Sequence, residues 1–225
     1  MIVFTTILTN EPAAERLIER WATTEDQRHA SLRRTAAAQA CSLLARSALR
    51  GLLERYTAHG DWVIGADNLG KLLVETKAGA PGPLVSLAHT PGMAACAVGD
   101  IGPLGIDVER HRSRAFAAIA DYSFGPGERA LVSAHGIESF YRIWTLREAM
   151  SKATGQGLEL VTDGRDRVLN DSENASWLTR CDDVRWALTH RCPHPGFSLA
   201  LAARVDAKIN DAGQVFESTV ADTLL

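Results

Sequence analysis

Apolar residues recur along the first half of the chain in two rhythms, one typical of helices and one typical of strands. Spacings of three and four residues predict a long amphipathic helix from about Arg33 to Tyr56, with Arg46 and Arg50 away from its apolar stripe. Short β-branched and apolar runs predict strands. The other expected elements are a strand at Ile2–Leu8, a helix at Pro12–Trp21, and strands at Trp62–Ile64, Leu72–Glu75, Leu84–Leu87 and Met93–Val98.

The second half again holds helices followed by strands, after a turn at residues 99–103. We therefore predict an α+β fold made of two similar halves, residues 1–103 and 104–205, with a loose C-terminal tail at 206–225. No sequence repeat demonstrates a duplication. The expected elements are an acidic strand at Gly105–Glu109, a helical stretch after Ser113, a helix at Glu138–Thr154, and strands at Val184–Thr189 and Phe197–Ala203.

The composition narrows the class of protein. The 225 residues are 46% hydrophobic and carry a net charge of −3, which predicts a substantial core and gives no reason to expect binding to nucleic acid or to an anionic membrane. The four cysteines are widely spaced, which favours reduced thiols. Since the first residues do not resemble a signal peptide and no run reaches about 18 apolar residues, we expect a soluble, cytoplasmic protein.

Two acids alternate along the acidic strand. Successive side chains of a strand point to opposite faces, so Asp107 and Glu109 share one face, with Cα atoms roughly 6.5–7 Å apart. Ionised carboxylates this close repel each other unless a cation lies between them, and Mg²⁺ prefers such oxygen ligands. The alternative is a solvated edge strand whose acids pair with Arg110, Arg112 and Arg114.

The helix predicted at 138–154 adds an acid and a lysine one turn apart. Glu148 and Lys152 lie away from its apolar stripe, and Gly155 is a plausible helix end. On their own the two residues would form an ordinary surface pair. Together with the acidic strand they predict a site for a hard metal ion and a phosphate, built from three carboxylates and one cation.

In this order, the motifs resemble those of the long, two-half (Sfp-like) 4′-phosphopantetheinyl transferases. The family's S-H, G-[IV]-D-[VI]-E and W-[ST]-x-K-E-A-x-x-K motifs correspond to residues 87–90, 105–109 and 144–152. The family's G-x-G-L matches residues 155–158, and its F-S-x-x-E element is loosely echoed by residues 124–128. The resemblance implies two α+β halves packed as a pseudo-dimer.

It also implies a reaction. The enzyme would move the 4′-phosphopantetheine arm of coenzyme A to a serine of an apo acyl or peptidyl carrier protein, with Mg²⁺, and would release adenosine 3′,5′-bisphosphate. We expect it to act as a monomer. The residues that match the family's site are Asp107, Glu109 and Glu148 as magnesium ligands, Lys152 as the catalytic-site lysine, His89 at the 3′-phosphate of coenzyme A and Lys71 near its phosphates. The base for the carrier serine is either Glu148 or a metal-bound water.

Three positions depart from the family pattern: Ala88 replaces a serine, Leu72 a proline and Arg147 a frequent lysine. We expect these changes to affect coenzyme A affinity more than metal binding, because all three acids are present. Two other functions stay open, namely a different Mg²⁺-dependent phosphoryl or pyrophosphate enzyme, and a catalytically weak module that binds coenzyme A or a carrier protein.

Two further clusters of residues indicate a function less clearly. The stretch 190–194, with Cys181, holds histidine and cysteine side chains, but its spacing fits no zinc pattern and its prolines predict a loop. Arg28, Arg33 and Arg34 form either a solvated face or a surface for coenzyme A or the carrier. The three arginines just after the acidic strand are expected to meet an acidic carrier surface.

Overall fold

The computed structural model of the protein describes residues 1–68, 70–113, 115–169, 175–206, 208–209 and 211–224. The chain forms two compact units, Met1–Gly102 with Gln214–Leu225, and Pro103–Gly213. Both units combine helices with antiparallel strands, which confirms the predicted α+β class. None of the helices in the described ranges is long and apolar enough to cross a membrane.

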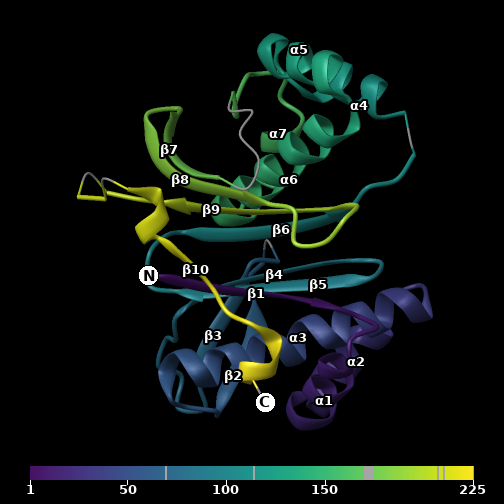
Figure 1. Ribbon diagram of the computed structural model, residues 1–225. Helices are drawn as coiled ribbons and strands as arrows, with labels where there is room; N and C mark the ends of the chain where they lie inside the picture. The colour runs from purple at the N-terminus through teal and green to yellow at the C-terminus, as the bar shows by residue number, and fades with distance from the viewer. Residues whose placement is uncertain (69, 114, 170–174, 207, 210, 225) are drawn as a thin grey trace. The chain divides into compact units, whose positions relative to one another are not determined.

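The first unit packs a long helix on a four-stranded sheet of order β10-β1-β5-β4 (Figure 1). The predicted long helix is α3, and it packs against β5, β4 and β1, while α1 and α2 pack against α3. Its apolar side chains form the core of this unit together with the inner face of the sheet. The elements are β1 (Ile2–Leu8), α1 (Pro12–Trp21), α2 (Thr24–Ser31), α3 (Ala36–Thr57), β2 (Trp62–Ala66), β3 (Leu72–Thr76), β4 (Leu84–Thr90) and β5 (Met93–Gly99).

Arg46 and Arg50 lie off the apolar stripe of α3, as the sequence indicated, but this face of the helix packs against α2 and is not solvated. Both donate to the fully buried carboxylate of Asp26 in α2, at 2.7 and 2.5 Å. Burial alone would raise the pKa of Asp26, but hydrogen bonds from Arg50, Arg46 and Thr23 outweigh it and lower the pKa to about 2. Arg50 Nη1 also donates to the carbonyl of Trp62 at 3.0 Å, so this clamp joins α2 and α3 to β2.

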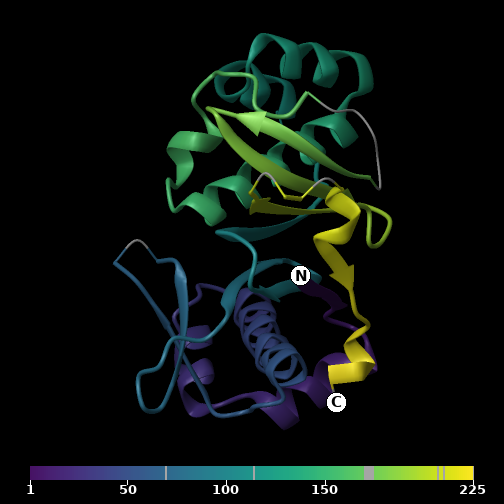
Figure 2. The same ribbon diagram turned by 90° about the vertical axis from the view of Figure 1, so that its left-hand side faces the viewer.

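Strands β2 and β3 form a separate antiparallel hairpin, which Figure 2 shows extending beside α3. Lys71 directly precedes β3 and is half-buried. The sequence ended the predicted strand at Leu87, whereas β4 continues through His89, which pairs with Ala94 of β5.

The loose C-terminal tail expected from the sequence is wrong for the described end of the chain. Strand β10 pairs in parallel with β1, and Val215 and Leu224 are buried. The indole of Trp21 donates to the carbonyl of Leu224 at 2.8 Å. The elements of this end are the 3₁₀ turn Ala212–Gln214, β10 (Phe216–Ser218) and the 3₁₀ turn Ala221–Leu224.

The second unit packs α6 on a four-stranded antiparallel sheet of order β6-β9-β8-β7 (Figure 1). The predicted acidic strand is β6, and the predicted helix at 138–154 is α6, which packs against β6 and β9. The apolar stripe of α6, which includes Leu146, Met150 and Ala153, forms a core with the facing residues of the sheet. The elements are β6 (Leu104–Arg110), α4 (Phe116–Ser123), α5 (Pro126–His135), α6 (Ile137–Thr154), α7 (Leu158–Val161), β7 (Ser176–Cys181), β8 (Val184–Arg191) and β9 (Phe197–Arg204).

Candidate active site

Strand β6 directs Asp107 toward helix α6. Asp107 pairs in register with Ala200 of β9, and Ala200 packs in the core beneath α6, so both side chains lie on the helix-facing side of the sheet. Asp107 is only 7% exposed. Its Oδ1 accepts a hydrogen bond from Lys152 Nζ at 2.8 Å, whereas its Oδ2 is buried and no described residue donates to it. One oxygen of this carboxylate is thus left for another partner.

Helix α6 supplies the lysine and the second acid. Lys152 Nζ donates to the carbonyl of Ile106 at 3.1 Å as well as to Asp107, so the ammonium group is bound to the strand at two points. Glu148, one turn earlier, is half-buried. The helix ends at Gly155, whose left-handed conformation (φ 75°) terminates it three residues after Lys152. The structure therefore brings Asp107 and Lys152 together.

Gly105 explains how the strand and the helix come this close. A Cβ atom at this position would lie 2.0 Å from the carbonyl oxygen of Ala149 and 2.7 Å from the amide nitrogen of Ala153. Only a residue without a side chain allows this approach of backbone to backbone. The glycine of the G-I-D-V-E motif thus sets the distance between the strand that carries Asp107 and the helix that carries Glu148 and Lys152.

We expect Gly105→Ala to destabilise the protein and to weaken the contact between Asp107 and Lys152, because the added methyl group must push α6 away from β6. Overpacking of this kind costs roughly 1–3 kcal/mol or more. Urea unfolding would measure the loss. Gly164→Ala is a poor control because that glycine has a positive φ, but Gly65→Ala is suitable, since a Cβ there meets nothing within 4 Å. Equal stability of Gly105→Ala and Gly65→Ala would contradict the role given to Gly105.

The electrostatics of the site favour a bound cation. Burial raises the pKa of Glu148, the charge of Asp107 raises it further, and Lys152 opposes both effects. The negative charges of Asp107 and Glu148 thus share the positive charge of Lys152. A divalent cation would remove this repulsion.

The carboxylates of Asp107 and Glu148 suit Mg²⁺, although the described residues form no complete three-residue site. Within the described residues, no three His, Cys, Asp or Glu side chains are arranged to hold a metal ion. Mg²⁺ usually takes one or two protein carboxylates together with water and substrate phosphate. Asp107, with its unpartnered Oδ2, and Glu148 meet that requirement. Glu109 is half-buried two residues further along β6, and its role as a ligand stays a prediction.

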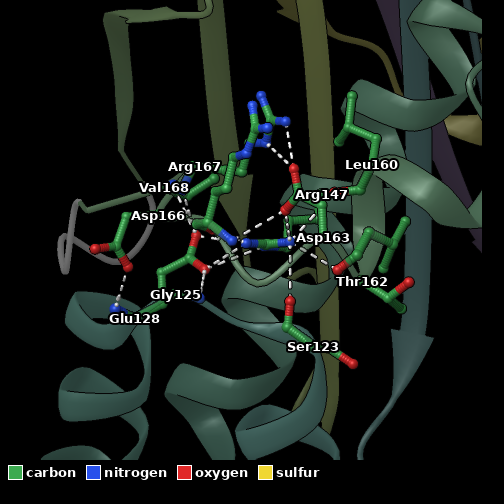
Figure 3. Close-up of polar contacts among 12 residues, drawn as sticks. Ser123, Gly125, Glu128, Arg147, Leu160, Thr162, Asp163, Asp166, Arg167 and Val168 are labelled. Carbon is green, nitrogen blue, oxygen red and sulfur yellow. Dashed lines mark hydrogen bonds and ion pairs between the residues drawn. The ribbon is translucent and has the colours of Figure 1, made fainter.

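Arg147 lies next to Glu148 on α6, but it points into the protein (Figure 3). It is 0% exposed and its guanidinium bonds the equally buried carboxylate of Glu128, with Nη2 2.7 Å from Oε2. Its Nη1 donates to the carbonyl of Val161 at 2.7 Å, and its Nη2 donates to the carbonyl of Arg165. The remaining acceptors of Nη1 are the carbonyls of Ser123 and Leu160 and the carboxylate of Asp163.

Glu128 in turn holds the neighbouring loop. Its Oε1 accepts from the backbone amides of Arg167 and Val168 at 3.0 and 2.8 Å, and its Oε2 accepts from the amide of Gly125. A Cβ atom at Gly125 would lie 2.2 Å from the amide nitrogen of Asp166, so this glycine allows the loop to approach α5. The 124–128 element and the helix motif are therefore joined by a buried ion pair.

This arrangement changes the interpretation of Arg147. The sequence counted it among the departures that would affect coenzyme A affinity, but a side chain that is fully buried and bonded on every side positions α6 against α7 and the residues that follow it. Sequence reasoning also missed the role of Glu128. The available signal was the faint F-x-x-x-E echo at 124–128, which gave no indication of its partner.

The remaining candidates come from other segments of the chain. Lys71 and His89 belong to the first unit, whereas Asp107, Glu109, Glu148 and Lys152 belong to the second. Arg28 is exposed and pairs with Glu25 at 2.6 Å, and Arg33 and Arg34 are exposed. Arg110 and Arg112 are also exposed, whereas Arg114 lies outside the described residues, so a docking role for these arginines stays a prediction.

The stretch suspected of binding zinc does not form the predicted loop at its start. His190 and Arg191 are the last residues of β8. His190 is buried, and neither of its ring nitrogens has a hydrogen-bond partner among the described residues. Burial lowers the pKa of His190 to about 3, with further contributions from Arg142, His111 and Arg191, so this imidazole is neutral. Cys192 is exposed and all four cysteines are free thiols.

Comparison with known proteins identifies the class of enzyme. Residues 103–202 match the family model for the 4′-phosphopantetheinyl transferase superfamily. The 4′-phosphopantetheinyl transferase HetI of Nostoc sp. strain PCC 7120 is 29% identical over 164 residues, which cover 70% of this chain and 68% of HetI. Residues 103–202 therefore match a 4′-phosphopantetheinyl transferase superfamily domain, and the similarity to HetI supports an enzyme that transfers phosphopantetheine. The family match falls within the second unit, which holds Asp107, Glu148 and Lys152.

Proposed function

We propose that the protein transfers the 4′-phosphopantetheine arm of coenzyme A to a serine hydroxyl of an apo acyl or peptidyl carrier protein. The reaction would depend on Mg²⁺ and would release adenosine 3′,5′-bisphosphate. The observation that carries this proposal is the carboxylate of Asp107, which is bound by Lys152 on one oxygen and buried without a partner on the other. We further propose that the enzyme acts as a monomer in the cytoplasm.

The chemistry requires stabilisation of negative charge. The reaction breaks the phosphoanhydride bond of coenzyme A, and charge develops on the leaving and non-bridging oxygens. Mg²⁺, when bound, would supply positive charge at the pyrophosphate. Lys152 is bonded to the strand through the carbonyl of Ile106 and through Asp107, so its ammonium group is held in place before substrate binds. A pre-positioned cation of this kind needs little reorganisation during the reaction.

Glu148 is the residue best suited to accept the proton from the carrier serine. It lies one helical turn from Lys152 and close enough to Asp107 for the two charges to interact, and a carboxylate within hydrogen-bond reach is a suitable acceptor for a serine proton. The oxygen of the serine would attack the phosphorus of the arm while its proton passes to a carboxylate oxygen of Glu148. The bond from that phosphorus to the bisphosphate would then break.

His89→Ala is expected to raise the KM for coenzyme A more than it lowers kcat, since His89 is proposed to bind the 3′-phosphate, which is remote from the bond that breaks. Loss of one charge-assisted hydrogen bond costs roughly 1.5–3 kcal/mol. Steady-state kinetics with coenzyme A and 3′-dephospho-coenzyme A would separate the effects, with His59→Ala, an exposed histidine of the same unit, as control. Equal damage with both substrates would remove His89 from the 3′-phosphate.

Detection of adenosine 3′,5′-bisphosphate tests what becomes of coenzyme A in the proposed reaction. Chromatography of the small molecules should show this product only when enzyme, Mg²⁺, coenzyme A and an apo carrier protein are all present. Release without a carrier would instead favour a pyrophosphate hydrolase. Binding of coenzyme A without any release, for every carrier tested, would favour a binding module.

A further inference from the structure

The end of strand β6 just beyond Glu109 is held by side chains that the proposed reaction does not use. Tyr141 of α6 is 1% exposed, and its hydroxyl accepts a hydrogen bond from the backbone amide of Arg112 at 2.9 Å. The same hydroxyl donates to the carbonyl of Arg112 at 3.3 Å. One tyrosine thus binds both polar groups of a residue that follows the strand.

His111 connects this contact to the neighbouring strand. Its ring stacks on the ring of Tyr141, with centroids 4.6 Å apart and planes 9° from parallel. Its Nε2 lies 2.9 Å from the hydroxyl of Ser198 in β9, a residue that is 1% exposed. Ser198 is the register partner of Glu109. We call Tyr141, His111 and Ser198 the strand-end latch.

The latch lies on the side of the sheet that carries the carboxylates. Side chains alternate along a strand, so Asp107 and Glu109 share a face, and the bond of His111 to Ser198, the partner of Glu109, places the imidazole at the same end of that face. In the second unit β6 is an edge strand with β9 as its neighbour. Glu109 is the penultimate residue of β6, where strand ends are least constrained.

We propose that the strand-end latch is a positioning device for the end of β6 that carries Glu109, and that it keeps this carboxylate within reach of Mg²⁺ bound at Asp107 and Glu148. This inference rests on the proposed function, because it takes Glu109 as a metal ligand. A metal site requires its ligands to be held within about 0.5 Å of their working positions, and supporting contacts provide that precision. Asp107 is fixed by Lys152 and Gly105 fixes the approach of α6, whereas the latch fixes the far end of the same strand.

Tyr141→Phe tests the latch, because it removes the two hydrogen bonds to Arg112 and keeps the aromatic ring that stacks on His111. The measurement is the Mg²⁺ concentration that gives half of the maximal rise in melting temperature, with coenzyme A saturating and no carrier protein, so that no turnover occurs. We expect this concentration to rise by up to about tenfold, the lower end of the effect of removing a direct partner of a metal ligand, because Tyr141 acts on Glu109 through the backbone of Arg112. Tyr122→Phe, at a tyrosine that is 80% exposed on α4, is the matched control and should match the wild type.

Ser198→Ala is the second variant, and it is sufficient if Tyr141→Phe does not fold. It removes only the contact with His111 Nε2 and should also weaken the response to Mg²⁺. A double-mutant cycle with Glu109→Gln then shows whether the latch acts through Glu109. If it does, adding either latch variant to Glu109→Gln changes the Mg²⁺ midpoint no further.

The outcomes separate the latch from the proposed function. A wild-type Mg²⁺ midpoint for Glu109→Gln would overturn both the role of Glu109 as a ligand and the latch. A weakened Glu109→Gln combined with wild-type midpoints for Tyr141→Phe and Ser198→Ala would overturn the latch alone. Additive effects in the double variants would also overturn it, because they would show that Tyr141 and Ser198 support the fold and not Glu109.

Discussion

Glu148→Gln is expected to abolish phosphopantetheine transfer without lowering the melting temperature of the unliganded protein. The substitution keeps the size of the side chain but removes a half-buried charge that lies close enough to Asp107 to be destabilised by it. A group whose pKa is raised in the folded state destabilises that state once the pH exceeds its ordinary pKa, so at pH 7 its neutral replacement should leave stability equal or higher. Activity and a thermal melt measured on the same preparation would show both effects.

Glu138→Gln is the matched control for this variant, because Glu138 is an exposed glutamate in the first turn of the same helix. It should retain full activity. Near wild-type turnover by Glu148→Gln would remove Glu148 from the site. A clear fall in its melting temperature would show that the carboxylate stabilises the fold, against the electrostatic argument given above.

Arg147→Met is expected to cause the largest loss of stability among the variants considered, because it leaves the carboxylate of Glu128 buried without its cation. Breaking a buried ion pair by removing one partner costs roughly 3–5 kcal/mol. Urea unfolding would measure this loss. Arg129→Met, at an exposed arginine of α5, should change the free energy of unfolding by about 0.5 kcal/mol or less.

Removing both charges distinguishes this explanation from a simple packing defect. In the double variant Arg147→Met with Glu128→Gln, no unpaired ion remains, so part of the lost stability should return. Arg147→Lys keeps the charge but cannot reproduce the set of bonds that reach Glu128, Val161 and the carbonyl of Arg165. Full stability of Arg147→Met would contradict the role assigned to this ion pair.

The sequence predicted the elements whose patterns are local. Helix α6 was expected at 138–154 and begins one residue earlier, because its apolar stripe and the glycine at its end are both readable along the chain. The sequence also located strands β1, β5 and β9, because their short apolar runs can be recognised along the chain. Helix α2 was missed because its sequence, TEDQRHAS, carries almost no apolar stripe. What identifies it in the structure is the capping box between Thr23 and Asp26.

Contacts between distant residues could not be predicted in this way. The sequence placed Asp107 and Lys152 in separate motifs, and the joint occurrence of these motifs predicted a common site, but it did not reveal that Gly105 permits the contact. The pairing of Arg147 with Glu128 spans 19 residues, and the pairing of Asp26 with Arg46 spans 20. The spacing of apolar residues shows which face of a helix is apolar. An arginine on another face is then assigned to solvent or to substrate, even where the structure buries it.

The measurement that tests the central claim most directly is the intact mass of an apo carrier protein after incubation with this enzyme, coenzyme A and Mg²⁺. The carrier should gain the mass of one 4′-phosphopantetheine arm, and a carrier whose acceptor serine is replaced by alanine should gain nothing. The gain should disappear with Glu148→Gln and persist with Glu138→Gln. If apo acyl and apo peptidyl carriers alike keep their original mass while a known transferase modifies the same preparations, the proposed function is contradicted.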